Sequence, residues 1–552
     1  MEKAVEKLKS LWAKAGVRWL LGYLFILFCG VGVVYYWRVF YEFQEIPPLL
    51  LTVLVCSLSI FVTTVLLIIK RFIKNFSVRA ALMILLCGIC FCFANPPMQA
   101  PDESSHFLRA YSISEGYFNF DASRSYSNDV NALITCFPGA WVNGNTTYWL
   151  ETNEEGVVKF NSSENIAIKN VNGKRISLGG QFTEYYQMCE EKNAPNIYES
   201  QIAQLLPYLH QAVFMIVARL LGFGALGCLY AGRIANIFVY ALLCWLTLKR
   251  LSSDCCVFLA IQLLPMSLYI ASSCNYDALM LGLYYLMISY FDISELSNYD
   301  VTLFAFAFIM VNAVKPWINL LWIVVLLMLP NHRWKSRIKK SKTLLLIMLL
   351  TLLAIFVVEW YGQTFRVDFS DGRMLGNTVD MMDQLSFVLH HIPRTFMVLL
   401  GTLYENTLYL NKLGTFGALD LEIPLIGVIS PMMLTMGAAL NEHESRKLTL
   451  QNTAGWGALA LIYIGGVLTA QYITYTPVGM VRVLGVQVRY LLPVFLILFL
   501  LLSKLFSRVR ENVWFGNVIK RNFWLIICVC FALLAAVLLA QHYYIGPVCI
   551  VP

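Results

Sequence analysis

Apolar runs long enough to cross a membrane recur along most of this 552-residue chain. The first covers 17–39, and runs of about 18 to 24 residues continue almost to the C-terminus, each able to cross a hydrocarbon core of about 30 Å as a helix. This pattern predicts an all-α polytopic membrane protein with about 13 transmembrane helices, within a range of about 11 to 14.

Basic clusters between the apolar runs predict the orientation of the chain. A basic tail precedes the first run, and the strongest cluster, HRWKSRIKKSK, covers 332–342. Because Lys and Arg accumulate on the cytoplasmic side, we expect a multi-pass protein of the inner (cytoplasmic) membrane with a cytoplasmic N-terminus. The resulting segments are the N-terminal tail with three spans (1–94), an extracytoplasmic loop (95–224), central spans (225–361), a second extracytoplasmic segment (362–424) and C-terminal spans (425–552).

The long polar segment after the third run, 95–204, is predicted to lie on the outer side. Loops of this length are seldom structureless, so we expect a helix after Pro101 and a small mixed α/β lobe within 120–200. Two apolar stretches interrupted by polar residues, 202–221 and 387–410, suit juxtamembrane helices lying at the interface.

The composition excludes an ordinary soluble protein and argues against nucleic acid as a partner. Hydrophobic residues make up 59% of the chain and charged residues 13%. The formal net charge of +8 comes from short clusters between apolar runs, which act as topology signals. Most cysteines lie inside apolar runs, whereas Cys136 and Cys189 in the polar segment form either a disulfide or two reduced thiols.

Four ionisable residues follow the third run in the sequence NPPMQAPDESSHFLRA. The prolines end that run and start a helix on which Asp102, His106 and Arg109 share one face, with Glu103 beside them. A carboxylate and a cation at headgroup level could take a proton from an acceptor hydroxyl and stabilise a departing phosphate. The alternative is that Asp102 and Glu103 only cap and charge the helix N-terminus.

Further candidate residues stand at the predicted outer ends of spans. Asp277, in SSCNYDALM, is either a second site carboxylate or an N-cap. Lys315, Arg482, and Arg489 with Tyr490 could bind a lipid phosphate, and ordinary snorkelling is the alternative for these cations.

A charged residue inside an apolar run and two histidines stay outside the candidate set. Arg233 would be costly facing lipid, so we expect it to pair inside the protein or with a headgroup, and favour an internal pair. His390 and His391 are interpreted as interfacial polar residues.

Several short motifs occur in a fixed order between 95 and 493. They are PDESSHFLRA, LPYLHQAVFMIVARLLG, LYAGRIANI, LPMSLYIASSCNYDALM, VKPWINL, LGTFGALDLEIP and VRYLLP. The set resembles a bacterial family of predicted membrane proteins in the GT-C glycosyltransferase superfamily. In such proteins Gly usually precedes the Arg-Tyr pair, whereas Val488 stands here.

The resemblance implies a GT-C-like fold with Asp102 as catalytic base and Glu103 supporting it. Asp277 matches the position of a second outer-face carboxylate in that superfamily. With the residues named above, the candidate substrate- or phosphate-binding set is His106, Arg109, Asp277, Lys315, Arg482, Arg489 and Tyr490.

The expected function is transfer of a sugar, with inversion, from a polyprenyl-phosphate donor to a cell-envelope glycan or glycolipid on the outer face. No nucleotide-binding fingerprint is visible, which fits a donor already carried on lipid. We expect no required cofactor, although the site leaves room for a divalent cation. The alternatives are a polysaccharide polymerase or ligase, and a transporter or flippase of lipid-linked sugars.

Overall fold

The computed structural model describes most of the chain after residue 70. The described ranges are 71–119, 124–137, 147–152, 158–163, 178–197, 204–251, 253–364, 379–405, 415–416, 421–422, 435–437, 450–507 and 521–540, with single residues at 24, 53, 57, 60, 64, 65, 68, 69, 439 and 543. The first two predicted spans lie almost entirely outside these residues.

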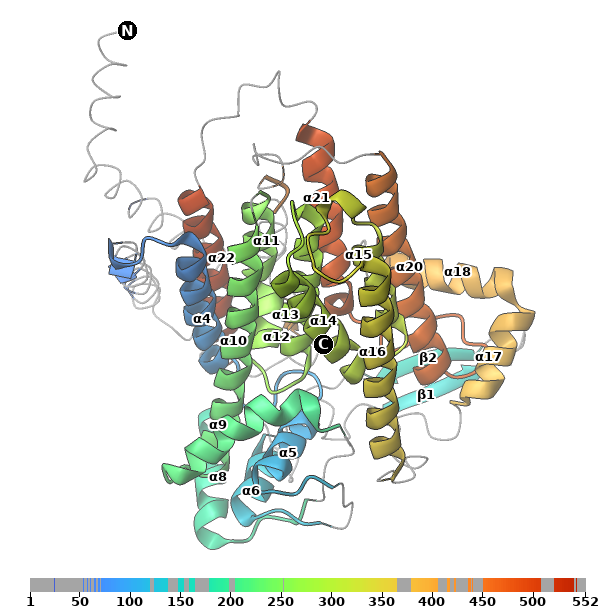
Figure 1. Ribbon diagram of the computed structural model, residues 1–552. Helices are drawn as coiled ribbons and strands as arrows, with labels where there is room; N and C mark the ends of the chain where they lie inside the picture. The colour runs from blue at the N-terminus through green and yellow to red at the C-terminus, as the bar shows by residue number, and fades with distance from the viewer. Residues whose placement is uncertain are drawn as a thin grey trace, which may run out of the picture.

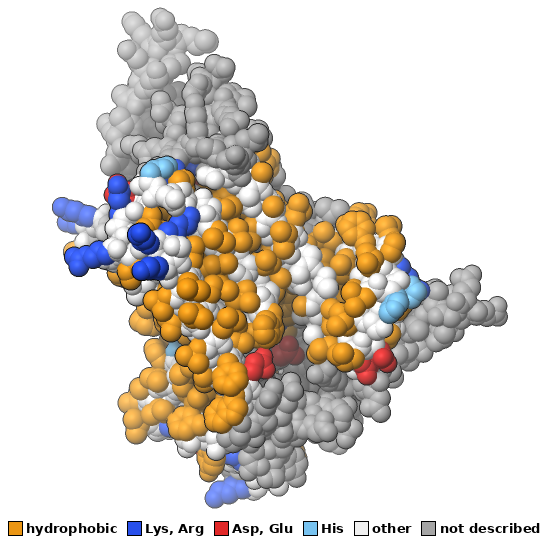
Figure 2. Space-filling view, turned by 45° about the vertical axis from the view of Figure 1, so that its right-hand side comes forward, with side chains coloured by type: hydrophobic (Ala, Val, Ile, Leu, Met, Phe, Trp, Pro, Cys, Tyr) orange, Lys and Arg blue, Asp and Glu red, His pale blue; other side chains and the backbone are white. Residues whose placement is uncertain are grey.

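The chain is a helical membrane protein. Within the described residues, five helices are long and apolar enough to cross a bilayer, and six shorter apolar helices accompany them. Figure 2 shows apolar side chains covering most of one face, with the larger group of Lys and Arg side chains near one end of it. The five long segments are α4 (Phe76–Ala94), α10 (Ala225–Arg250), α16 (Lys340–Thr364), α20 (Leu450–Tyr475), and α21 (Leu492–Ser507) with the preceding η9 (Val488–Leu491).

Helix α10 lies at the centre of the packing, against α4 and α13 (Asp277–Ile288) (Figure 1). Small residues allow the close approach. A Cβ built at Gly88 of α4 would stand 2.0 Å from a side-chain atom of Ile237 in α10. Between membrane helices, where lipid is as apolar as the side chains, such close backbone packing is a main source of association.

Two apolar runs within the central segment 225–361, each long enough in sequence to be interpreted as one span, are interrupted. The run 257–271 consists of α11 (Cys255–Gln262) and α12 (Pro265–Ala271), because Pro265 lacks the N–H that would continue the helix. The run 317–329 is η3 (Ile318–Ile323) followed by the short α15 (Val324–Leu327).

The described part of the long loop contains helices and one hairpin. The helix predicted after Pro101 is confirmed as α5 (Glu103–Ser114), and the predicted juxtamembrane stretch forms α9 (Leu209–Leu220). In Figure 1, α5, α6, α8 and α9 lie together at one end of the bundle. Cys136 and Cys189 are both free thiols.

The remaining described elements are α6 (Asn128–Cys136), β1 (Thr147–Thr152), β2 (Val158–Ser163), α8 (Leu178–Glu191), η1 (Leu206–Tyr208), η2 (Ser289–Asp292), α14 (Asn298–Val314), η4 (Asn331–Arg333), α17 (Met381–His390), α18 (Ile392–Leu403), β3 (Thr415–Phe416), β4 (Leu421–Glu422) and α22 (Arg521–Ala540). Strands β1 and β2 pair antiparallel, as do β3 and β4. Whether the segment 120–200 forms a separate mixed lobe stays a prediction.

Ion pairs join helix ends at the end of the bundle opposite α5. Asp254, before α11, is wholly buried against Lys504 of α21 and also accepts a hydrogen bond from Ser503 Oγ at 2.9 Å. Arg250, at the end of α10, pairs with Asp300 in the first turn of α14. The first pair holds the start of α11 against the end of α21, and the second holds the end of α10 against the start of α14.

Candidate functional site

The turn that carries Asp102 has an unusual backbone. After α4 ends, Met98 and Asp102 both take positive φ angles, 60° and 58°. A non-glycine residue in this left-handed region costs about 1 kcal/mol or more, and Asp tolerates it better than most residues. Asp102 stands at the N-cap of α5, but its side chain makes no capping hydrogen bond and is exposed. Asp102 therefore does not cap the helix with its side chain, whereas the other part of that alternative, a negative charge at the helix N-terminus, matches its position.

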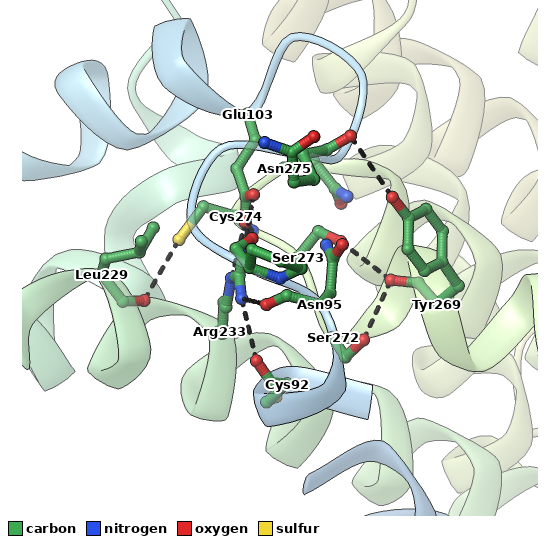
Figure 3. A network of polar contacts seen from close by, with 12 residues as sticks. Cys92, Asn95, Glu103, Leu229, Arg233, Tyr269, Ser272, Ser273, Cys274 and Asn275 are labelled. Atoms are coloured by element: carbon green, nitrogen blue, oxygen red, sulfur yellow. Dashed lines mark hydrogen bonds and ion pairs between the residues drawn. The ribbon is translucent and has the colours of Figure 1, made fainter. Parts of the chain in front are cut away.

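The neighbouring Glu103 points into the protein and is fully buried (Figure 3). Its Oε2 lies 2.6 Å from Arg233 Nη2 and its Oε1 lies 2.8 Å from Arg233 Nε, so the two groups meet fork to fork. Glu103 Oε1 also accepts the backbone N–H of Cys274 at 2.9 Å. The expected internal pairing of Arg233 is confirmed, and both oxygens of Glu103 are engaged in structure.

Asp277 lies between two cations at the same end of the bundle. Its Oδ1 is 3.6 Å from Lys315 Nζ, and its Oδ2 is 3.4 Å from Arg489 Nε. The three residues come from the start of α13, the end of α14 and η9, all at the helix ends predicted to lie outside. The fold thus gathers into one cluster three residues that the sequence analysis could only place at a common level.

Two tyrosines enclose the lysine of this cluster. Lys315 Nζ lies 4.7 Å from the ring centre of Tyr276 and 4.9 Å from that of Tyr490, distances typical of cation–π contacts. The backbone just beyond is strained, since Trp317 has a φ of 71°. Such strain tends to collect where a functional group must be held in one place.

Arg489 is the least satisfied member of the cluster. Its side chain is only 8% exposed, against 14% for Asp277 and 35% for Lys315. Within the part of the chain that the structure describes, its Nε is buried and makes no hydrogen bond. A buried guanidinium needs acceptors for its fixed fork of donors, and Asp277 Oδ2 at 3.4 Å is an ion-pair partner rather than a hydrogen-bonded one, so an anion in this place could accept from Arg489.

A cavity of about 140 Å³ opens beside the cluster. Asp277, Lys315, Arg489 and Tyr490 form its charged end. The rest of its wall is largely apolar and aromatic and comes from α12, α13, η3, α20 and α21: Ile270, Met280, Leu281, Tyr284, Ile318, Asn319, Tyr463, Val467, Ala470, Gln471, Thr474 and Pro493. The cavity therefore combines a polar head region with an apolar slot between membrane helices.

His106 connects Asp102 to this cluster. Its Nδ1 lies 2.6 Å from Tyr208 Oη, and its ring packs edge-on against Tyr276. Burial lowers the pKa of His106 to about 4, although the charges of Asp102 and Asp277 act in the opposite direction. The imidazole is therefore neutral at pH 7. The Asp102 carboxylate is close enough to His106 and Arg489 to interact electrostatically with both.

Two candidate residues have other surroundings. Arg109 is buried and donates to the backbone carbonyls of Gln204 at 3.0 Å and Phe118 at 2.8 Å, which fastens the loop. Arg482 is 57% exposed and pairs with Glu405 at 2.9 Å. The described contacts of these two arginines, with backbone carbonyls and with Glu405, are structural.

Tyr208 and Tyr276 complete the surroundings of His106 and Lys315 and were not predicted. Tyr276 directly precedes Asp277, and Tyr208 stands in the LPYLH motif, so their positions in the sequence were a usable signal. Among the described residues, no group of three or more His, Cys, Asp or Glu side chains is arranged to hold a metal ion.

Comparison with known families matches residues 85–498 to the model described as "Predicted membrane protein (DUF2142)". The matched range covers most of the chain and includes every candidate residue discussed above. The chain therefore belongs to this family. No curated protein and no solved structure matches it.

Proposed function

We propose that this member of the DUF2142 family is a GT-C-type glycosyltransferase that transfers a sugar from a polyprenyl-phosphate donor to an envelope glycan or glycolipid. The proposal includes the finer arrangement inferred from the sequence: about 13 spans, a cytoplasmic N-terminus, and the Asp102 end of the bundle at the outer face of the inner membrane.

The observation that carries the proposal is the charged end of the cavity beside an apolar slot. Asp277 contributes one negative charge and Lys315 and Arg489 contribute two positive charges, so this part of the site has a net charge of +1. A phosphodiester with one negative charge complements it. The apolar wall along α13 and α20 suits the first part of a hydrocarbon chain.

The proposed reaction is a single displacement. Asp102 takes the proton of the acceptor hydroxyl while that oxygen forms a bond to the anomeric carbon. The bond from the anomeric carbon to the phosphate oxygen breaks on the opposite side, and the electron pair leaves with polyprenyl phosphate. Lys315 and Arg489 stabilise the charge that develops on the leaving phosphate. Attack opposite to the leaving group inverts the anomeric centre.

His106 and Asp277 are assigned supporting parts in this scheme. In this scheme a neutral imidazole held by Tyr208 leaves the role of the base to Asp102. Asp277 keeps Lys315 and Arg489 apart and oriented before the phosphate arrives. The scheme uses the two side-chain cations for the phosphate and requires no cofactor.

The experiment that tests the proposal compares cells carrying the wild type, Asp102→Asn, or the control Glu190→Gln on the exposed face of α8. Asparagine tolerates the left-handed backbone of position 102, so the substitution removes the negative, proton-accepting carboxylate and keeps the backbone conformation. Membrane abundance is first shown to be equal. Loss of one sugar substituent from the envelope, with accumulation of a polyprenyl-phosphate sugar in Asp102→Asn alone, is the expected result. Unchanged glycan and unchanged donor would refute the proposal.

A further inference from the structure

Arg233 makes an unusually complete set of contacts for a charged residue in a membrane helix. Besides Glu103, its guanidinium donates to three backbone carbonyls at the end of α4: Cys92 at 2.8 Å, Asn95 at 2.6 Å and Pro96 at 2.8 Å. These are carbonyls that the ending helix cannot satisfy itself. One side chain of α10 therefore holds both the end of α4 and the start of α5.

The same residues also fix the loop that leads to Asp277. Glu103 accepts the N–H of Cys274, three positions before Asp277 (Figure 3). Asn236, one helical turn after Arg233 on α10, donates to the carbonyl of Asn275 at 2.9 Å. Asn275 Oδ1 in turn accepts the N–H of Ala278 at 3.1 Å, in the first turn of α13. The turn before Asp102 and the turn before Asp277 are thus held by one face of α10.

We infer that Arg233 is a positioning residue that, through Glu103, sets the separation between the two carboxylates Asp102 and Asp277. The part of this inference that concerns catalysis by the two carboxylates rests on the proposed function. Asp102 directly precedes Glu103 in the chain, so a shift of Glu103 moves the exposed carboxylate. Because Glu103 also accepts the N–H of Cys274, a shift of Glu103 moves the backbone that leads from Cys274 to Asp277 as well.

The geometry explains why an arginine is required. Arg233 makes five hydrogen bonds in a fixed plane, whereas lysine offers one rotating ammonium with three donors. Arg233→Lys keeps the positive charge in the buried site and removes the planar set of guanidinium donors. Glu103→Gln keeps the size of the side chain and removes the charge. The two variants disturb the same junction by different chemistry.

Hydrogen exchange of the full-length protein in lipid nanodiscs, read by mass spectrometry, tests the inference without an activity assay. Arg219→Lys is the matched control, because Arg219 also bonds α5 but at the far end, through Ser114 Oγ at 2.8 Å. We expect Arg233→Lys and Glu103→Gln to raise deuterium uptake at least threefold in peptides covering 95–106 and 272–278 together. The control should leave both peptides unchanged.

The second measurement is the turnover of a polyprenyl-phosphate sugar by the purified protein. We expect kcat to fall at least tenfold in Glu103→Gln, with a smaller change in KM, because the phosphate-binding cations are retained. If exchange does not rise in either peptide, or rises equally throughout the bundle, the positioning role is overturned. If exchange rises in both peptides but the wild type transfers no sugar, the positioning of the carboxylates stands and the proposed function fails.

Discussion

Arg489 Nε and Asp277 Oδ2 approach to 3.4 Å at one end of the bundle, from segments that are far apart in the chain. The first pair joins the start of α13 to η9, and at the other end of the bundle Asp254, before α11, forms a second buried pair with Lys504 of α21. Arg489 and Lys504 are 15 positions apart (504 − 489), which corresponds to about 22 Å along a helix. The Asp254–Lys504 pair therefore helps to set the axial position of α21, and Arg489 stands just before the opposite end of that helix.

Breaking the Asp254–Lys504 pair should destabilise the protein strongly. Lys504→Met removes the cation that pairs with the fully buried carboxylate of Asp254, and the loss of one partner of a buried pair typically costs about 3–5 kcal/mol. We expect the unfolding free energy of Lys504→Met, measured by steric trapping in bicelles, to be lower than that of the wild type by this amount. The double variant Asp254→Asn with Lys504→Met should regain most of it, since no uncompensated charge remains. Equal losses in the single and double variants would show that packing rather than charge pairing is responsible.

Removing the guanidinium of Arg489 should weaken phosphate binding. The loss of a charge-assisted hydrogen bond costs about 1.5–3 kcal/mol, or about 10–100-fold in affinity. We expect this for Arg489→Gln in binding to vesicles that contain undecaprenyl phosphate, with vesicles lacking it as reference. Arg482→Gln is the matched control, because Arg482 is exposed and pairs with Glu405. A larger effect in the control would place the anion site elsewhere.

Asp277→Asn should change affinity and turnover in opposite directions. Asp277 competes with an incoming phosphate for Lys315 and Arg489, so its neutralisation raises the net charge of the cluster. We expect several-fold tighter binding of undecaprenyl phosphate in the same vesicle assay and slower sugar transfer, because the product is released more slowly. Weaker binding would mean that Asp277 acts mainly by orienting the cations.

Acid should destabilise the wild type through His106. Its folded-state pKa is about 4, below the ordinary value of 6.5, so the unfolded chain binds more protons between these values. The stabilisation is fully present above pH 6.5 and is lost as the pH falls towards 4, by at most about 1.4 kcal/mol per pH unit. Thermal unfolding of wild type and His106→Gln across this window measures it. The unfolding temperatures of the two proteins, plotted against pH, should converge at low pH. Parallel plots would exclude His106 as the source of the acid sensitivity.

Asp102 and Glu103 show how far a local pattern reaches. The sequence predicted the helix after Pro101 and a charged helix start, because proline and the acids act on the backbone nearby. Helical spacing also placed Asp102, His106 and Arg109 on one face. It could not show that Arg109 would meet the carbonyls of Gln204 and Phe118, since these neighbours come from other parts of the loop.

The sequence by itself determined the membrane class and the common level of Asp277, Lys315 and Arg489, and it favoured an internal pair for Arg233 over a lipid headgroup. These follow from the cost of placing charges in lipid and from the alternation of spans. Only the tertiary structure decided that Glu103 faces Arg233 and that Asp277 lies between the two cations. Such contacts depend on the rotation and axial shift of whole helices, which are set by packing between residues hundreds of positions apart.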